Sequence, residues 1–314
     1  MSFFASSRRH ATREIRTHST HSGTPSVSNS LRHCAEMVRE RDYASYLASG
    51  NFTAPFRDAF LALRAFSIEM ASVPEMVSNP TLGKMRFQWW RDMLKQIYED
   101  DPPHQPIAEA VHYAARVAGR VPAYHLKRII DARHSDLTKT SYSSVSDLTD
   151  LAEATSSTLL YAQLALVPLP PQAQDNHSHI ASHIGTAWGL STLLRALPYH
   201  AAQRRLVLPV DLTVAHGVSH EDVFRYGRDA KGVSDAVYAL ATEANDHVLA
   251  ARQLLEDGGM VEQAAPIILA ASVPTMMYLE RLEKADFDAF APELQTKDWK
   301  LAWRMWRAVR SRQI

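Results

Sequence analysis

Helical periodicity is the feature of this 314-residue sequence that most restricts its fold. From residue 35 onward apolar residues recur three and four positions apart, and alternating strand patterns are nearly absent. Such spacing gives each segment an apolar stripe along one helix face. Because no internal repeat or second compositional block is present, we predict one all-α domain over residues 34–314. Proline or glycine marks the joints between the predicted helices, which are residues 32–48, 54–73, 80–99, 105–118, 122–135, 146–166, 177–197, 219–227, 232–257, 260–284 and 297–311.

Composition excludes several classes of protein. The 34 basic and 34 acidic side chains balance, so the chain has no overall field for nucleic acid. Its longest apolar stretches, residues 159–169 and 264–273, are too short to cross a bilayer core of about 30 Å. The single cysteine, Cys34, excludes an internal disulfide framework and indicates a reducing compartment. We therefore expect a soluble or membrane-peripheral protein without a nucleic-acid partner.

The first 33 residues differ in composition from the rest. They hold five arginines and one acid, and they are rich in serine, threonine and histidine. This composition is typical of a mitochondrial transit peptide, and a helix here would carry arginines on one face and apolar residues on the other. Residues 23–30 are turn-rich and predict a cleavage site or linker. A basic tail without a targeting role is the alternative.

Residues 183–218 form a glycine-containing helix pattern followed by an Arg-x-x-Leu-Pro run and a Gly-Val pair. This pattern resembles the second signature of the squalene/phytoene synthase family. In that family an asparagine and two aspartates recur every four residues on one helix face and hold magnesium. Thr192, Ala196 and His200 stand at those places, and they lack the hard oxygen ligands that magnesium needs. Pro198 should also bend or end the helix before His200. The matching residues are Gly185, Ala187, Leu194, Arg195, Arg205, Leu208, Pro209, Gly217 and Val218.

The partner signature of the same family shows the same loss. Residues 55–73 predict a helix that aligns with the family's first aspartate-bearing helix. Ser67 and Ala71 occupy the aspartate positions, and the helical spacing places both on the buried stripe. The resemblance therefore implies an isoprenoid-synthase-like helical bundle with no catalytic or metal-binding residues at these five positions.

Three longer passages, residues 62–73, 82–111 and 192–225, resemble the branch of this family represented by assembly factor 6 of mitochondrial respiratory complex I. That branch implies a non-catalytic assembly factor without a cofactor, on the matrix side of the inner membrane, with complex I subunits or assembly intermediates as partners. The alternatives are an active prenyl-diphosphate transferase with rearranged ligands and a protein that binds an isoprenoid or lipid without turnover. Arg195 and Arg205 are candidates for contacting an anionic head group, or for structural ion pairs.

Other polar clusters favour structural roles. His177, His179 and His183 come nearest to a zinc-ligand spacing, but no cysteine or carboxylate partner closes a site, so we predict no metal here. The acids near residue 147 follow Ser144 and predict an N-terminal helix cap. The sequence also lacks a nucleophile elbow and a glycine-rich phosphate loop.

The C-terminal segment, residues 297–312, predicts an amphipathic helix. Tryptophan prefers the membrane interface and basic residues attract anionic lipid, so this helix is a candidate membrane or partner contact. A packing helix capped by charges is the alternative. One flank of the predicted helix carries Trp299, Trp303, Trp306 and Val309, and the other carries Lys300, Arg304, Arg307 and Arg310.

Overall fold

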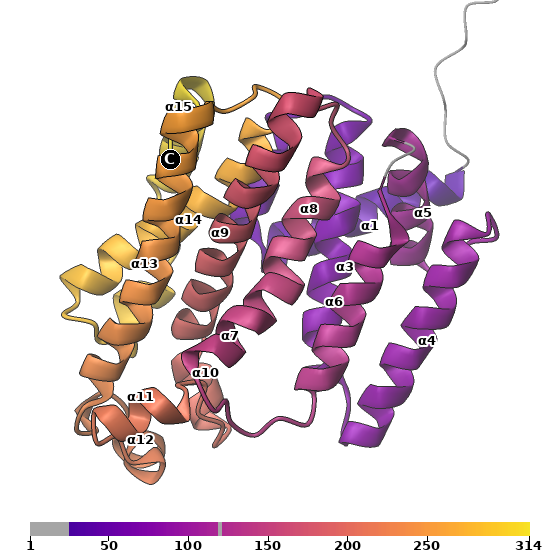
Figure 1. The fold of residues 1–314 in the computed structure, drawn as a ribbon. Coiled ribbons are helices and arrows are strands. Elements are labelled where there is room, and N and C mark those ends of the chain that lie inside the picture. Colours follow the sequence, from indigo (N-terminus) through magenta and orange to yellow (C-terminus); the bar gives the residue numbers. More distant parts are fainter. Residues whose placement is uncertain (1–24, 119–120) are drawn as a thin grey trace, which may run out of the picture.

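The computed structural model describes residues 25–118 and 121–314, and within these ranges the chain contains helices and no β-strand (Figure 1). The all-α prediction is therefore confirmed. The helices are α1 Pro25–Arg41, α2 Tyr43–Ser49, α3 Phe56–Met76, α4 Pro80–Tyr98, α5 Pro106–Ala118, α6 Ala123–Asp136, α7 Val145–Ala152, α8 Thr158–Leu164, α9 Pro171–Arg195, α10 Leu197–Ala202, α11 Val210–Ala215, α12 His220–Tyr226, α13 Val233–Gly258, α14 Ala265–Lys284 and α15 Leu301–Ser311. A π-helical turn, η1 (Glu153–Ser157), joins α7 to α8, and two 3₁₀ turns are η2 (Gly227–Asp229) and η3 (Pro292–Gln295).

The first helix starts earlier than predicted. α1 begins at Pro25, so the linker predicted for residues 23–30 is wrong from residue 25 onward. The Ser30 hydroxyl is buried and donates a 2.6 Å hydrogen bond to the Glu109 carboxylate of α5. Packing against α3 and α5 stabilises a serine-rich stretch that has weak helix propensity of its own. The transit-peptide prediction covers residues 1–33, of which residues 1–24 lie outside the described ranges.

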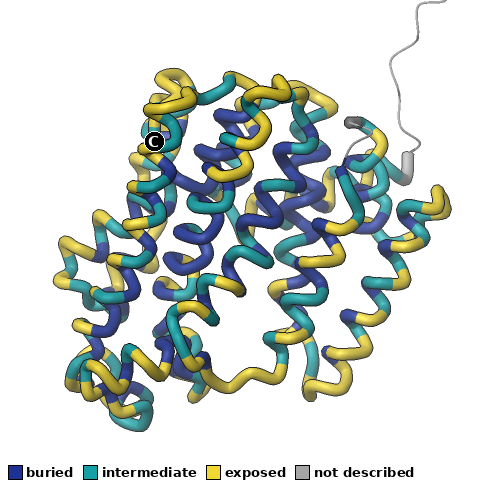
Figure 2. Tube along the Cα trace, viewed as in Figure 1, coloured by how far each residue is buried: buried dark blue, intermediate teal, exposed yellow. Residues whose placement is uncertain are grey.

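Two apolar clusters form the core, and α9 belongs to both. Its N-terminal half contributes Ile180 and Ile184 to the larger cluster, while its C-terminal half contributes Leu190 and Leu194 to the smaller one. Figure 2 shows that buried residues gather along the middle of the bundle, whereas exposed residues gather on the outer helices and loops. The helix that carries the second family signature is therefore the central support of the fold.

Glycines allow this central helix to approach its neighbours closely. A Cβ atom added at Gly185 would overlap the backbone of Ser157 in η1, and one added at Gly189 would crowd Ala152 at the end of α7. No side chain fits at these two contacts, which gives a packing reason for Gly185 of the signature and for Gly189 one turn later.

The end of α9 agrees with the sequence-based expectation. The helix stops at Arg195, Ala196 is its C-cap, and α10 starts at Leu197 with Pro198 in its first turn. Because proline lacks the backbone donor that would continue α9, that helix ends before His200.

Candidate functional site

The two signature helices face each other, as the family resemblance implies. The Arg64 guanidinium of α3 lies 4.2 Å from the centre of the Trp188 ring of α9. Further along, the Tyr199 hydroxyl of α10 donates a 3.1 Å hydrogen bond to the Glu75 carboxylate of α3. Along the chain, Ser67, Ala71, Thr192 and Ala196 lie between these two contacts and His200 follows Tyr199 directly, so the structure brings the five positions to one region. We call this region the signature site, and it comprises Ser67, Ala71, Thr192, Ala196 and His200.

Exposure differs among the signature positions. Ser67, Ala196 and His200 are half-buried, while Ala71 and Thr192 are exposed. The expectation that Ala71 lies on the buried stripe is therefore wrong. The apolar stripe of α3 passes through Met70 on the adjacent position, and one residue along a helix turns the side chain by about 100°.

The signature site offers little chemistry. The Thr192 hydroxyl donates to the Trp188 carbonyl at 2.8 Å within its own helix. Glu69, the acid of α3 that lies between Ser67 and Ala71 in the sequence, forms an ion pair with Arg86 at 2.6 Å. Among the described residues no group of three or more His, Cys, Asp or Glu is arranged to hold a metal ion. None of the five positions of the signature site carries a carboxylate, the kind of oxygen ligand that magnesium prefers.

A buried arginine lies beside the signature site. Arg64 is 1% exposed, and its three guanidinium nitrogens have no hydrogen-bond partner within the described structure. Its guanidinium stacks on Trp188 and lies 5.6 Å from the centre of the Phe60 ring, while its Nε is 3.8 Å from the Asp42 carboxylate. Burial lowers the pKa of Arg64, and the Asp42 charge opposes that shift. The faces of Trp188 and Phe60 and the Asp42 carboxylate thus stabilise the buried guanidinium.

A basic pocket opens at the C-terminal end of α9. It has a volume of about 280 Å³ and lies between α2, α14 and η3. Arg41 and Arg281 donate hydrogen bonds to neutral oxygens, so neither is held by a carboxylate. We call this cavity the basic pocket. Its cationic lining residues, none of which forms an ion pair within the described part of the chain, are Arg41, Arg195, Arg281 and Lys297.

Two of the three acids that line the basic pocket accept hydrogen bonds from neighbouring residues. Asp42 accepts hydrogen bonds from the Ser45 backbone N–H and hydroxyl, and Asp298 accepts from the Lys300 backbone N–H. Glu40 is the third acid of the lining, so cations outnumber carboxylates by four to three. This arrangement favours an anionic group over a cation.

The two arginines of the signature separate in the structure. Arg195 lines the basic pocket. Arg205 instead donates to the Asp136 carboxylate at 3.3 Å and to the Tyr142 hydroxyl at 2.9 Å. Arg205 therefore forms a structural ion pair that ties the chain after α10 to the end of α6.

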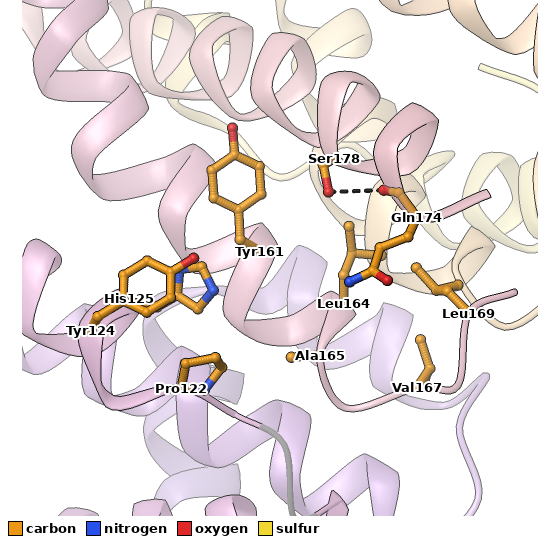
Figure 3. A pocket seen from close by; sticks show the side chains of 10 residues that line it. All are labelled: Pro122, Tyr124, His125, Tyr161, Leu164, Ala165, Val167, Leu169, Gln174 and Ser178. Carbon is orange, nitrogen blue, oxygen red and sulfur yellow. Dashed lines mark hydrogen bonds between the residues drawn. The ribbon is translucent and has the colours of Figure 1, made fainter. Parts of the chain in front are cut away.

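A second cavity had no signal in the sequence. It has a volume of about 410 Å³ and lies between α6, α8 and the start of α9 (Figure 3). The rings of Tyr124 and Tyr161 flank His125, and the Tyr161 hydroxyl donates to Glu153 at 2.8 Å. Burial lowers the pKa of His125 to about 4, so its imidazole is neutral at neutral pH. The cavity suits an apolar body and provides no general base that titrates near neutrality.

The C-terminal helix presents its aromatic and basic side chains together. Trp303 and Trp306 are 55% and 57% exposed, and the guanidinium groups of Arg307 and Arg310 lie 5.5 Å and 5.8 Å from the respective ring centres. Met305 on the opposite face is buried in the core. We call the exposed face, Trp303, Trp306, Arg307 and Arg310, the α15 face. The predicted separation into an aromatic and a basic flank is wrong, because Trp and Arg positions three, four and seven apart share one helical side.

Four residues of the predicted amphipathic segment lie outside the α15 face, one of which is Lys300, the N-cap of the helix. Trp299 precedes the helix and is 84% exposed. Arg304 pairs with Glu280 of α14 at 2.7 Å, so its charge is partly used within the fold. Val309 packs against the core. In the ranges that the structure describes, no helix is both long and apolar enough to cross a membrane.

Comparison with known proteins identifies the family. The sequence model of the squalene/phytoene synthase family matches residues 38–307. The chain is 40% identical over 275 residues to a Rattus norvegicus protein named NADH dehydrogenase (ubiquinone) complex I, assembly factor 6, covering 87% of this chain and 80% of the relative. The Homo sapiens protein of that name is 38% identical over 275 residues, with the same coverage of 87% and 80%. The Drosophila melanogaster homologue is 34% identical over 262 residues, covering 82% and 76%.

Solved structures show the same fold at much lower sequence identity. A dehydrosqualene synthase crystal structure matches with a TM-score of 0.77 and 14% identity, covering 91% of this chain and 97% of that one. A squalene synthase from Alicyclobacillus acidocaldarius matches with a TM-score of 0.69 and 15% identity, covering 83% and 96%. At this identity the likeness concerns the fold alone, which is the isoprenoid-synthase-like helical bundle that the sequence predicts. Because the family model matches residues 38–307 and the solved structures share the fold, this chain belongs to the squalene/phytoene synthase family.

Proposed function

We propose that this protein is a non-catalytic assembly factor for mitochondrial respiratory complex I. The observation that carries the proposal is its 38–40% identity, over most of both chains, to proteins named complex I assembly factor 6. Its partners are then complex I subunits or assembly intermediates. A nucleic-acid partner is not expected, because the basic and acidic side chains balance.

The composition of the signature site supports a role without catalysis. Release of diphosphate from a prenyl donor develops negative charge on the leaving group, and bound magnesium ordinarily stabilises that charge by several kcal/mol. Ser67, Ala71, Thr192, Ala196 and His200 supply no carboxylate for this purpose. We expect purified protein with magnesium and farnesyl diphosphate to release no diphosphate above the background without protein. Metal-dependent formation of a squalene-like product would refute the non-catalytic part of the proposal.

The α15 face supports attachment to the matrix side of the inner membrane. Indole rings prefer the membrane interface, and arginines stacked on them can reach anionic head groups. Its four residues stand on one exposed face while Met305 anchors the helix to the core. An anionic bilayer is the occupant that this combination of chemistry favours. An import signal in the arginine-rich residues before α1 completes the proposed route into mitochondria.

The basic pocket favours a second candidate function, which is binding of an anionic lipid or isoprenoid head group without turnover. Arg195 and Lys297 reach it from different elements, and neither forms an ion pair within the described residues. Ligand binding of this kind is compatible with an assembly role. It would appear as saturable binding of a prenyl diphosphate or anionic lipid that weakens when Arg195 is changed to Gln.

Deletion of the gene tests the assembly role. We expect cells without this protein to lose assembled complex I and to keep normal levels of complex II, which serves as the control. Native gels and NADH:ubiquinone activity provide the measurement, and re-expression of the full chain should restore both. Normal complex I in the deletion strain would refute the assembly role, whatever the protein does with lipids.

A further inference from the structure

Two histidines meet where α9 and α13 pack along each other. The Nδ1 atom of His183 lies 2.9 Å from the Nδ1 atom of His247, and the ring centres are 5.2 Å apart. The two helices run side by side in Figure 1. Both side chains are half-buried. Two ring nitrogens that point at each other share either one proton or one metal ion.

A third histidine stands on the same side of α9. His179 precedes His183 by one helical turn, and residues four apart on a helix are neighbours. Both histidines line one cavity of about 390 Å³, whose other wall is formed by Ala250, Gln253 and Leu254 of α13. A pair of histidines four residues apart on one helix is a spacing that zinc sites use.

A carboxylate lies near the ring of His247 on the side away from His183. The Glu243 carboxylate lies 3.7 Å from Nε2 of His247, on the ring nitrogen that points away from His183. Histidines that bind metals commonly donate their other ring nitrogen to such a carboxylate, which fixes the tautomer with a free lone pair at the metal-facing nitrogen. At 3.7 Å the Glu243 carboxylate is beyond hydrogen-bond distance, and a small movement of this partly exposed side chain would place it on Nε2 and leave Nδ1 of His247 free to accept.

We propose that His179, His183 and His247 bind a divalent transition-metal ion between α9 and α13, with Zn²⁺ as the first candidate and Glu243 as the residue that orients His247. Imidazole ligands suit zinc, copper and nickel and disfavour magnesium and calcium. Two zinc–nitrogen bonds of about 2.0–2.1 Å at a tetrahedral angle separate the nitrogens by about 3.3 Å, so the observed pair must open by only a few tenths of an ångström.

The third ligand requires a side-chain movement. As they stand, no three ligand-type side chains within the described residues converge on one point. His179 is exposed, so a change of rotamer brings its ring towards His183 without disturbing the core. His177, the other histidine of this segment, is not part of the site, because it is buried and its Nε2 accepts from the Val261 backbone N–H at 3.0 Å.

Metal binding should be measured on the full-length protein after treatment with EDTA. Titration with Zn²⁺ is followed by calorimetry, and Co²⁺ serves as a visible-absorption probe of the geometry. We expect one ion per chain, tetrahedral-type Co²⁺ bands and a higher melting temperature, because the ion links α9 to α13. Glu243→Gln should weaken binding by about tenfold, the lower end of the effect of removing such a supporting carboxylate.

Variants of the proposed ligands distinguish a metal site between α9 and α13 from metal binding by the two histidines of α9 alone. His247→Ala should weaken Zn²⁺ binding by more than Glu243→Gln does and abolish the tetrahedral Co²⁺ bands. His179→Ala, at an exposed position where folding is not at risk, should weaken binding as well. His220→Ala on α12 is the matched control and should leave the affinity unchanged. No binding by the parent protein, or equal affinity in the His247→Ala protein, would overturn the proposal, since the second result would leave only a surface pair on α9.

Discussion

The signature site lacks the acids that the family resemblance implies, whereas the α15 face exposes aromatic side chains that are usually buried. At the signature site, Ser67, Ala71, Ala196 and His200 stand where the family resemblance implies aspartates, while Gly185, which supports the frame, matches the family pattern. On the α15 face, side chains that normally seek a core are displayed, with Trp303 and Trp306 more than half exposed. Under the proposed function, the helical frame around the signature site maintains the fold and the α15 face carries the interactions.

The frame should be the least tolerant part of the molecule. Gly185→Val places a branched side chain against the backbone of Ser157 in η1. Overpacking of this kind should lower the free energy of unfolding by about 3 kcal/mol or more. Urea denaturation measures the change, with Gly217→Ala as a comparison at a site where no atom blocks an added Cβ but the positive φ adds strain. Equal loss at both positions would show that steric conflict at η1 is not the cause.

Protonation of the buried His125 should lower the stability of the core in acid, whereas the α15 face should make no such contribution. Burial lowers its pKa from 6.5 to about 4 in the folded chain. The unfolded chain therefore binds a proton first as pH falls, so stability is complete above about pH 6.5 and declines by about 3 kcal/mol towards pH 4. Melting temperatures of the parent and His125→Phe proteins across this range provide the test. An unchanged pH profile in the variant would exclude His125 as the source.

Replacement of the buried arginine distinguishes its volume from its charge. Arg64→Ala should cost about 3 kcal/mol, because it leaves a cavity against Trp188 and leaves Asp42 without its cation. Arg64→Met keeps most of the volume and removes three unpartnered nitrogens, so its cost should be much smaller. Equal losses in chemical denaturation would mean that the charge, not the packing, stabilises this position.

Restored carboxylates should not restore catalysis. Ala71→Asp is exposed and should change stability by less than about 0.5 kcal/mol. Ala196→Asp is half-buried and should cost about 1 kcal/mol, because an unpaired charge loses part of its hydration. The double variant should still release no diphosphate from farnesyl diphosphate with magnesium. Turnover by the double variant would show that the signature site needs only its acids to work.

The α15 face should combine the smallest stability effect with a large binding effect. Trp303→Ser with Trp306→Ser should leave the melting temperature nearly unchanged, because both rings are largely solvated. The same double variant should lose co-sedimentation with vesicles that contain anionic phospholipid. Leu249→Ser on α13, also an exposed apolar residue, is the matched control. Normal vesicle binding by the double variant would assign the α15 face to a protein partner instead.

The sequence was sufficient for the parts of the fold that repeat a strong local pattern. The long helices follow from their apolar spacing, and the stop of α9 before Pro198 follows from the missing backbone donor of proline. The cap at Ser144 was also predicted, and the structure confirms a capping box with Asp147. Each of these features depends on residues within one or two helical turns.

Contacts between distant parts of the chain determine the features that the local sequence pattern did not predict. α1 begins at Pro25 because Ser30 and Cys34 pack into the bundle, although the local composition resembles a linker. The α15 face mixes Trp and Arg because Met305 and Val309 dock on the core and set the rotation of the helix. The partner of His183 stands 64 residues away on α13, so no local spacing could identify it.

Complex I abundance in a deletion strain rescued by paired variants tests the central claim most directly. One strain expresses Ser67→Ala with Thr192→Ala, which removes the last hydroxyls of the signature site, and the other expresses Trp303→Ser with Trp306→Ser. With equal protein levels, native gels should show full complex I in the first strain and reduced complex I in the second. Full rescue by the α15 variant together with failure of the signature-site variant would contradict the account, because function would then depend on the signature site and not on the α15 face.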